Sequence, residues 1–276
     1  MRFTVTQAQR LRELGAPPAS VAAGYADAAA RDAAYKELER DLSRAGREQL
    51  QDYRAQRCVP PLVELERRTS DALIALGFAR VVTPLIISSE ALARMGIDQS
   101  HPLRQQVFWL DDGRCLRPML APNLYALMRR LGRLWSKPFG LLEIGPCFRR
   151  DTKGANHLNE FTMLNLVEVG GPAERAHARL EELAATVMKA AGIDGYRLVG
   201  TQSEVYGTTI DVEVDGVEVC SAAAGPHPLD GNWGIVDSWV GLGFGLERLL
   251  AAREGYANIE RAGRSLSYVD GVRLTI

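Results

Sequence analysis

The first 57 residues are predicted to be helical. Residues 22–57 are rich in Ala, Arg, Glu and Gln and lack glycine and proline from 25 to 45, a composition that favours helix. Thr6 is a candidate N-cap for a shorter helix that ends at Glu13. Arginines and carboxylates are interspersed along the longer segment, which fits either a solvated helix face or a surface that contacts nucleic acid.

A clear amphipathic helix is predicted at residues 62–76. Apolar residues recur there at helical spacing, and charged residues occupy the other positions. Gly77 ends this helix as a C-cap, and residues 78–83 read as a strand that ends at Pro84. The apolar positions are Leu62, Leu65, Ala72, Leu73 and Leu76.

Short strands separated by turns dominate the rest of the chain. Asp215-Gly216 between two alternating runs is a strong hairpin signal. Strands grouped in hairpins predict an α+β fold, in which a largely antiparallel β-sheet is flanked by helices. The predicted strands are 106–110, 141–148, 160–170, 209–214, 217–222 and 239–244, and the predicted helices are 122–131, 173–191 and 246–255.

The composition is that of a globular protein with a sizeable core. Of its 276 residues, 46% are hydrophobic and 24% are charged, so long disordered stretches are not expected. The formal net charge of −1 excludes a general basic field that attracts nucleic acid. A nucleic-acid partner would therefore need a local patch or a second protein.

The cysteines and the start of the chain limit the cellular context. Cys58, Cys115, Cys147 and Cys220 form no C-x-x-C pair, which argues against structural zinc and a disulfide framework. The start of the chain has no signal-peptide core, and no apolar run approaches the roughly 18 residues of a membrane span. We expect a cytoplasmic protein without a membrane partner.

A glycine-rich strand runs into a helix at residues 239–250. Gly241, Gly243 and Gly245 alternate, so one face of this strand carries no side chains and can accept a flat ring or a phosphate chain. Leu246 stands where a dinucleotide-binding G-x-G-x-x-G motif needs glycine. Arg248 follows in the first helical turn and favours a phosphate ligand, the alternative being a strand bared only for helix packing.

A second candidate site is the hairpin that contains Arg149. An arginine at the end of the first strand offers a fixed, charged fork that matches an α-phosphate. Phe161 on the second strand alternates with polar neighbours and could stack on an adenine ring. Taken alone, these residues equally fit an ordinary hairpin with surface charges.

Together, these segments resemble the class II aminoacyl-tRNA synthetases. Residues 77–84 are similar to their first motif, Phe148-Arg149-x-Asp151 to the second, and residues 241–248 to the third. The resemblance implies an antiparallel sheet, a homodimer, ATP bound in a bent form, and Mg2+. The second motif usually has glutamate where this chain has the shorter Asp151, so the contact with the adenine amino group fits least well.

A narrower resemblance is to the pyrrolysyl-tRNA synthetase family. It rests on the run from Cys115 to Tyr125 (Cys-Leu-Arg-Pro-Met-Leu-Ala-Pro-Asn-Leu-Tyr), on Glu-Phe-Thr-Met-Leu-Asn at 160–165, and on 262–268. It covers residues 60–276 as a catalytic domain, and residues 1–59 resemble the helical extension of compact members, with a tRNA contact implied. The end of the chain resembles bacterial members, whose further tRNA-binding domain is a separate protein and a candidate partner.

The resemblance implies a pocket for a long amino-acid side chain. Ala121, Leu124, Tyr125 and Met128 share one helical face, and periodicity alone favours a core role for them. Asn165 can donate to a side-chain amide carbonyl, while Tyr206 is either a mobile cap or a surface loop residue. The other implied pocket residues are Met163, Val167, Ala223, Trp239 and Gly241.

The implied ATP and metal sites use the charged residues. Glu218 and Ser221 match positions that bind Mg2+ in the family, and Cys220 between them is expected to face the other side of the sheet. The full implied ATP set is Arg149, Asp151, His157, Leu158, Phe161, Glu218, Ser221 and Arg248.

The implied activity has two steps, with Arg149 and Arg248 as its catalytic residues. The carboxylate of pyrrolysine attacks the α-phosphate of ATP and releases pyrophosphate, and the aminoacyl group then passes to the 3′ end of an amber-decoding tRNA. One alternative is an adenylate-forming paralogue that does not charge tRNA. Another is a non-catalytic regulatory relative, which the presence of Arg149, Arg248, Glu218 and Ser221 disfavours.

Overall fold

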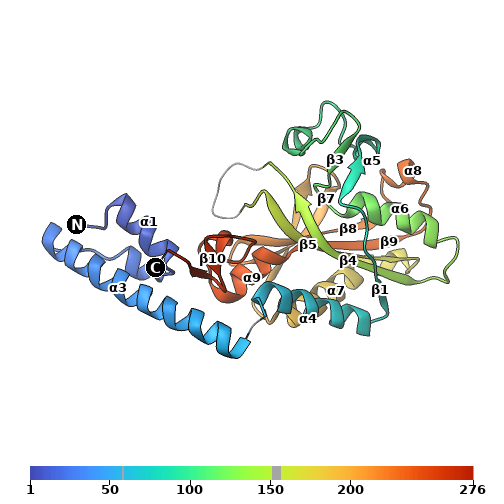
Figure 1. The fold of residues 1–276 in the computed structure, drawn as a ribbon. Coiled ribbons are helices and arrows are strands. Elements are labelled where there is room, and N and C mark those ends of the chain that lie inside the picture. The colour runs from blue at the N-terminus through green and yellow to red at the C-terminus, as the bar shows by residue number, and fades with distance from the viewer. Residues whose placement is uncertain (58, 151–156, 276) are drawn as a thin grey trace.

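The computed structural model describes residues 1–57, 59–150 and 157–275. Figure 1 shows a helical N-terminal part beside a larger body built on a twisted sheet. Cys58 and Asp151 lie outside the described residues. Within the described residues, no helix is long and apolar enough to cross a membrane.

Nine α-helices are present in the described part of the chain, and short helical turns of other types connect some of them. The α-helices are α1 (Val5–Glu13), α2 (Pro18–Val21), α3 (Ala28–Asp52), α4 (Pro61–Ala75), α5 (Ser89–Arg94), α6 (Ala121–Leu131), α7 (Ala176–Ala191), α8 (Asp230–Trp233) and α9 (Leu246–Glu254). The turns are η1 (Tyr53–Arg57), η2 (Pro102–Gln106), η3 (Ala173–Arg175) and η4 (Ile259–Arg261).

The described strands form one large sheet and two small ribbons. The large sheet has the order β1-β4-β5-β9-β8-β7-β6, and every neighbouring pair is antiparallel except β1 and β4. This confirms the predicted α+β fold with a largely antiparallel sheet. The strands are β1 (Phe78–Arg80), β2 (Ile86–Ser88), β3 (Arg114–Leu116), β4 (Phe139–Phe148), β5 (Glu160–Val169), β6 (Arg197–Ser203), β7 (Gly207–Val214), β8 (Val217–Gly225), β9 (Trp239–Gly245), β10 (Tyr268–Val269) and β11 (Val272–Arg273).

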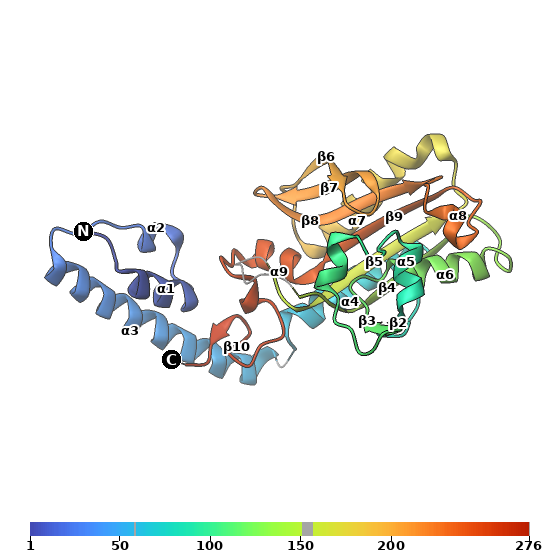
Figure 2. The ribbon, with the colours of Figure 1, turned by 90° about the horizontal axis from the view of Figure 1, so that it is seen from above.

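The two faces of the large sheet have different coverings. Helices α4, α7 and α9 cover one face, and side chains such as Leu164, Leu242 and Phe244 are buried beneath them. The opposite face meets α5, α6 and the β2–β3 ribbon through a second buried cluster that includes Tyr125 and Trp239. Figure 1 shows these layers from the side, with α5 and α6 above the sheet and α4 and α7 below it, and Figure 2 shows the sheet from above.

The N-terminal helices pack on one another and on the last strands. Phe3, Leu11, Ala16 and Val21 form a small core between α1, α2 and α3. The Gln49 side chain donates to the backbone carbonyl of Asp270 at 3.1 Å. The helical extension is thus fastened to a segment far away in the sequence, next to which Figure 1 places α3.

Two predicted boundaries in the extension were wrong. Thr4, not Thr6, caps α1, because its side chain accepts from the Gln7 amide while the Thr4 amide donates to the Gln7 side-chain oxygen. The long helix begins only at Ala28, where Asp27 supplies the cap. Each helix begins at a residue whose side chain caps it, and composition alone did not locate that residue.

The strand predicted at 106–110 is absent, and the described strands β2, β3, β6, β10 and β11 were not predicted. Pro102 starts the η2 turn instead, and Val107 and Trp109 reach the second cluster from a loop, with Trp109 forming one isolated bridge to Cys115. The missed strand β6 is an edge strand whose residues are mostly exposed, so it lacks an apolar alternation. The missed ribbon β2–β3 is too short to show a period.

Candidate functional site

A cavity of about 450 Å³ lies on the sheet face opposite α7 and α9. Its floor is formed by β5, β8 and β9, and its walls come from α6 and from the chain around the β6–β7 turn. Every site residue predicted from the sequence lines this cavity except Asp151, which lies outside the described residues. The structure therefore brings together the two candidate phosphate-binding segments and the candidate amino-acid pocket.

The bare face of β9 points into the cavity. Gly241, Gly243 and Gly245 line it, whereas the intervening Val240, Leu242 and Phe244 are buried under the helices. Directly opposite on β5 are Val167, Asn165 and Met163, in register with the three glycines. The glycine pattern thus leaves backbone exposed at the cavity floor, as the ligand interpretation requires, and is not used only for helix packing.

Arg248 sits where β9 passes into α9. Its Nη1 atom donates to the backbone carbonyl of Glu218 at 3.0 Å and lies 3.6 Å from the Glu218 carboxylate. The side chain is about a quarter exposed, so it keeps a face toward the cavity. A cation held at this strand end, above bare backbone, is placed to neutralise an anionic ligand.

Arg149 approaches the cavity from the end of β4. Its Nε donates to the Pro118 carbonyl at 2.9 Å, and its guanidinium lies 5.4 Å from the centre of the Phe161 ring. Its backbone amide bonds the Asn159 carbonyl, which ties it to the start of β5. Phe161 faces the cavity from β5, beside His157 and Leu158, so arginine and aromatic ring lie together as one binding surface.

A β-bulge explains how Glu218 and Ser221 share the cavity. Residues three apart on a regular strand point to opposite faces. Here Glu213 pairs with Glu218 and Val212 with Cys220, so β8 carries one extra residue and the alternation is reset. Both oxygen-bearing side chains line the cavity, while Cys220 is buried in the core on the helix side, as predicted.

Helix α6 supplies the apolar end of the cavity. Leu124, Tyr125 and Met128 are buried, and Ala121 lies at the start of the same face. The Tyr125 ring stacks on Trp233 at 5.6 Å and meets Trp239 edge-on at 5.7 Å. These residues belong to the core and also line the cavity, so a core role and a pocket role do not exclude each other.

Three buried polar side-chain atoms are left without a protein partner. Asn165 Oδ1, the Tyr125 hydroxyl and the indole Nε1 of Trp233, which stacks on Tyr125, make no hydrogen bond among the described residues. Burial raises the pKa of Tyr125, and the nearby Tyr206 and Asp230 side chains add to this shift, but neither makes a hydrogen bond with the Tyr125 hydroxyl. Unsatisfied buried polar groups are costly, so those of Asn165 and Tyr125, which line the cavity, mark where a ligand group would bind.

Tyr206 and Trp239 line the cavity side by side. The Tyr206 ring lies edge-on to Trp239 at 6.3 Å and to His227 at 5.4 Å. Burial raises the Tyr206 pKa, so its hydroxyl stays protonated and can act as a donor. The Trp239 indole donates to the buried Asp230 carboxylate at 3.0 Å, which fixes the ring against Gly225 of β8.

Several lining residues escaped the sequence prediction. Thr201 donates to Asp211 at 2.7 Å, and Asp211 lies in register with Ser221, so this pair extends the polar row of the cavity. Its strand β6 gave no apolar alternation that would have revealed it. The remaining missed lining residues are Leu103, Met119, Gln202, Ser203, Glu204, Val205, Leu166, Thr209, Val219, Ala222, Leu242, Glu247 and Ile259.

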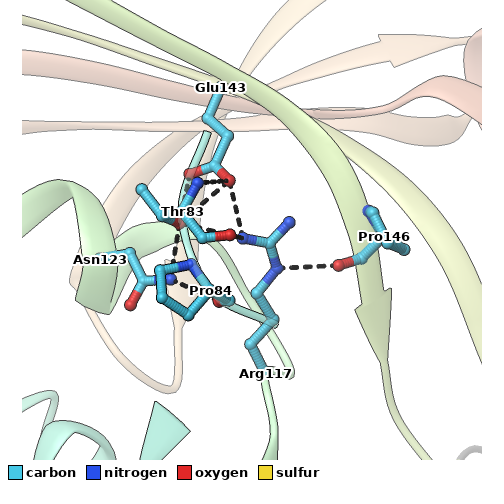
Figure 3. A network of polar contacts seen from close by, with 6 residues as sticks. All are labelled: Thr83, Pro84, Arg117, Asn123, Glu143 and Pro146. Carbon is cyan, nitrogen blue, oxygen red and sulfur yellow. Dashed lines mark hydrogen bonds and ion pairs between the residues drawn. The ribbon is translucent and has the colours of Figure 1, made fainter. Parts of the chain in front are cut away.

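A buried network supports the Arg149 segment from behind. Arg117 forms an ion pair with Glu143 at 2.7 Å and donates from Nε to the Pro146 carbonyl at 2.9 Å (Figure 3). Thr83 joins both charged groups, donating to Glu143 and accepting from Arg117. The Pro118 carbonyl accepts a hydrogen bond from Arg149, and Arg117 is the residue directly before Pro118. The buried network around Arg117 therefore fixes the segment that orients Arg149, a candidate phosphate-binding residue.

Two comparisons with known proteins match part of the chain. Residues 48–269 match the family model of the tRNA synthetases class II core domain (F). A segment of 123 residues is 29% identical to the phenylalanine–tRNA ligase alpha subunit of Thermosynechococcus vestitus. The matched segment covers 42% of this chain and 34% of that subunit, so the chain spans about a third of the length of this relative.

Two solved structures are similar over the whole chain. A crystal structure of pyrrolysyl-tRNA synthetase from Desulfitobacterium hafniense is 52% identical, with a TM-score of 0.95 over 100% of this chain and 99% of that one. A second structure of a pyrrolysyl-tRNA synthetase from the same organism is 52% identical, with a TM-score of 0.93 and coverage of 100% and 96%.

Proposed function

Because the chain belongs to the class II aminoacyl-tRNA synthetases, and within them to the pyrrolysyl-tRNA synthetases, we propose that it activates pyrrolysine with ATP and transfers it to the 3′ end of an amber-decoding tRNA. The observation that carries this proposal is the convergence of Arg149, Arg248 and the bare glycine face on one cavity. The apolar wall of α6 lies at the other end of the same cavity.

ATP would occupy the end of the cavity that holds the two arginines. Phe161 offers an aromatic face for the adenine ring, with the Arg149 guanidinium beside it to meet the α-phosphate. Arg248 would meet the terminal phosphates across the bare backbone of β9. Catalysis then needs no side-chain nucleophile, because the pyrrolysine carboxylate attacks the α-phosphate and the arginines neutralise the growing charge.

The oxygen donors of β8 fit a magnesium site. Carboxylate and hydroxyl oxygens are ligands that Mg2+ accepts, and the bulge brings Glu218 and Ser221 to the same cavity. No group of three or more His, Cys, Asp or Glu among the described residues could hold a metal by itself. Glu218 and Ser221 would therefore share Mg2+ with phosphate oxygens, and the ion would draw charge from the leaving pyrophosphate.

Pyrrolysine would extend toward α6 with its carboxylate near Arg149. Its long stem and ring need a deep apolar pocket with few polar groups, which Leu124, Met128 and Val167 provide. The amide of Asn165, whose Oδ1 lacks a partner, faces this space and would bond the side-chain amide of the substrate. The polarity of the proposed pocket thus matches that of the pyrrolysine side chain along its length.

The helical extension and the exposed apolar surface suggest the partners. We assign residues 1–59 a contact with tRNA and residues 60–276 the catalytic domain, with a separate tRNA-binding protein as a further cytoplasmic partner. A second copy of the chain would cover the apolar side chains that α4 and the nearby chain expose, which supports a homodimer. These side chains are Val63, Ile74, Leu76, Val82, Leu85 and Ile86.

The test uses two assays on one preparation. Pyrophosphate exchange into ATP should depend on pyrrolysine, and labelled pyrrolysine should then appear on the amber-decoding tRNA. Exchange without charging of the tRNA would favour the adenylate-forming paralogue. No exchange with pyrrolysine, by a folded protein that exchanges with another amino acid, would overturn the substrate assignment.

A further inference from the structure

The tripeptide His-Pro-Leu occurs twice in the chain, at His101–Leu103 and at His227–Leu229. The first copy begins η2 after a loop, and the second lies between β8 and α8. The two copies are more than 100 residues apart in sequence, yet both approach the short segment between β6 and β7, which carries Tyr206. Figure 2 shows β6, β7 and α8 in this part of the molecule.

Each copy folds into the same histidine-capped turn. Proline disfavours the helical conformation of the residue before it, and His101 is accordingly extended, with φ −72° and ψ 133°. Because proline has no amide hydrogen, the first available donor is that of the leucine. In both turns this amide donates to the histidine Nδ1, from Leu103 to His101 at 3.2 Å and from Leu229 to His227 at 3.2 Å.

The other ring nitrogen of each histidine reaches the same short segment. His101 Nε2 lies 3.2 Å from the Glu204 carbonyl, and His227 Nε2 lies 3.0 Å from the Tyr206 carbonyl. A backbone amide can only donate and a carbonyl can only accept, so in this arrangement Nδ1 of each ring accepts and Nε2 donates. Two rings of one tautomer therefore hold two carbonyls of a single loop.

The leucines anchor the turns in the core below the cavity. Leu229 belongs to the second buried cluster, and Leu103 packs against it, as do Val205 and Tyr206 of the loop. The loop itself is braced by Ser203, whose hydroxyl accepts from the Val205 and Tyr206 amides. Core, turn and loop thus form a continuous support beneath the Tyr206 ring.

We propose that His101 and His227 are positioning residues, a two-histidine clamp that holds Tyr206 over the amino-acid pocket before substrate binds. The clamp rests on the proposed function, because its purpose is to pre-order the lid of that pocket. A loop ordered in advance loses less entropy on binding, so the clamp should favour tight binding of the amino acid. It should leave ATP binding at the far end of the cavity unchanged.

Substitution by asparagine or by glutamine tests the two hydrogen bonds of each histidine ring one at a time. An asparagine Oδ1 occupies the place of the histidine Nδ1, so His101→Asn and His227→Asn keep the leucine bond but cannot reach the loop carbonyl. A glutamine amide extends to the place of Nε2 and can restore the donor to the loop. His177→Asn is a matched control, because that exposed histidine lies on α7 and pairs with Glu181.

The first measurement is independent of activity. In the double variant His101→Asn/His227→Asn, hydrogen exchange of the amides in residues 203–207 should rise by roughly tenfold or more, with the rest of the sheet unchanged. The glutamine double variant should recover most of the protection, and His177→Asn should match the parent. Unchanged exchange in a folded asparagine double variant would overturn the clamp.

The second measurement is pyrophosphate exchange with the full chain. The asparagine double variant should raise the KM for pyrrolysine about tenfold while the KM for ATP stays near that of the parent. A looser loop with an unaltered KM for pyrrolysine would overturn the positioning role. If the parent itself shows no activity with pyrrolysine, the proposed function fails while the hydrogen-exchange result still decides whether the clamp exists.

Discussion

Arg117 and Glu143 form an ion pair of 2.7 Å in which both side chains are about 1% exposed. Such a pair loses the solvation of two charges, and only further hydrogen bonds make it tolerable. Here Thr83 and the Pro146 carbonyl supply those bonds. Even the neighbouring Gly145 is required, because a Cβ there would lie 2.3 Å from the Arg117 guanidinium.

Removing one partner of this pair should destabilise the protein strongly. In Glu143→Ala the Arg117 charge stays buried without its counter-ion, so we expect the free energy of unfolding to fall by about 3–5 kcal/mol. Urea unfolding would measure it. The control Asp71→Ala breaks the exposed Arg67–Asp71 pair and should cost less than about 1 kcal/mol. Equal effects of the two substitutions would contradict the importance of the buried pair.

Loss of the Arg248 charge should remove catalysis without unfolding the chain. In Arg248→Ala we expect pyrophosphate exchange to fall by about a hundredfold or more, because a charge that stabilises the transition state is gone. Arg253→Ala on the same helix is the control, since Arg253 pairs with Glu254 and does not line the cavity. Near-normal exchange by a folded Arg248→Ala variant would refute the role of this arginine.

A single methyl group on the bare strand should obstruct the site. In Gly243→Ala the new Cβ would lie 3.3 Å from the Asn165 side-chain amide, so we expect kcat/KM for pyrrolysine to fall by roughly tenfold or more. Gly200→Ala provides the comparison, because a Cβ at Gly200 meets nothing within 4 Å. Steady-state pyrophosphate exchange measures both, and unaltered kinetics of Gly243→Ala would show that the bare face is not used.

The described cysteines should resist thiol reagents in the native state. Burial raises the pKa of Cys147 to about 12 and that of Cys115 to about 11, and it raises the pKa of the buried Cys220 as well. At pH 8 a thiol of pKa 12 is ionised in only about one molecule in ten thousand. A Cys58→Ser variant should therefore react with an aromatic disulfide only after denaturation, and rapid labelling of the folded variant would contradict the burial.

The pocket should accept lysine derivatives that carry bulky carbamates. Its walls are apolar, and shape discriminates only modestly for each added methylene. We expect pyrophosphate exchange with at least some such derivatives, abolished together with pyrrolysine activity by Arg248→Ala. A protein active on pyrrolysine that rejects all of them would argue for polar recognition of the ring.

Local patterns in the sequence predicted the sheet class and the bare face of β9, whereas most of the cavity residues were implied by the resemblance to a known family. Alternating glycines show which side of β9 is bare, and hairpin signals such as Asp215-Gly216, whose φ angles of 50° and 80° suit the turn, show how strands pair. The bulge in β8 was invisible, because an extra residue leaves no mark in a strand of small side chains.

Features that depend on distant partners could not be read from the chain. The strand predicted at 106–110 failed because Val107 and Trp109 are buried by tertiary contacts from a loop and not by pleating. The roles of Arg117, Asp211 and the two His-Pro-Leu turns likewise depend on residues 10 to 103 positions away. Local composition carries no information about such pairings.

The contact between the helical extension and the last strands sets an order of events during synthesis. Gln49 and Arg10 bond residues that are 221 and 265 positions later in the chain. The extension leaves the ribosome long before these partners exist, so its helices can form but cannot dock until almost all of the catalytic domain has been made. Closing this long loop is slow compared with local folding. The arrangement of the extension on the catalytic domain should therefore be completed late.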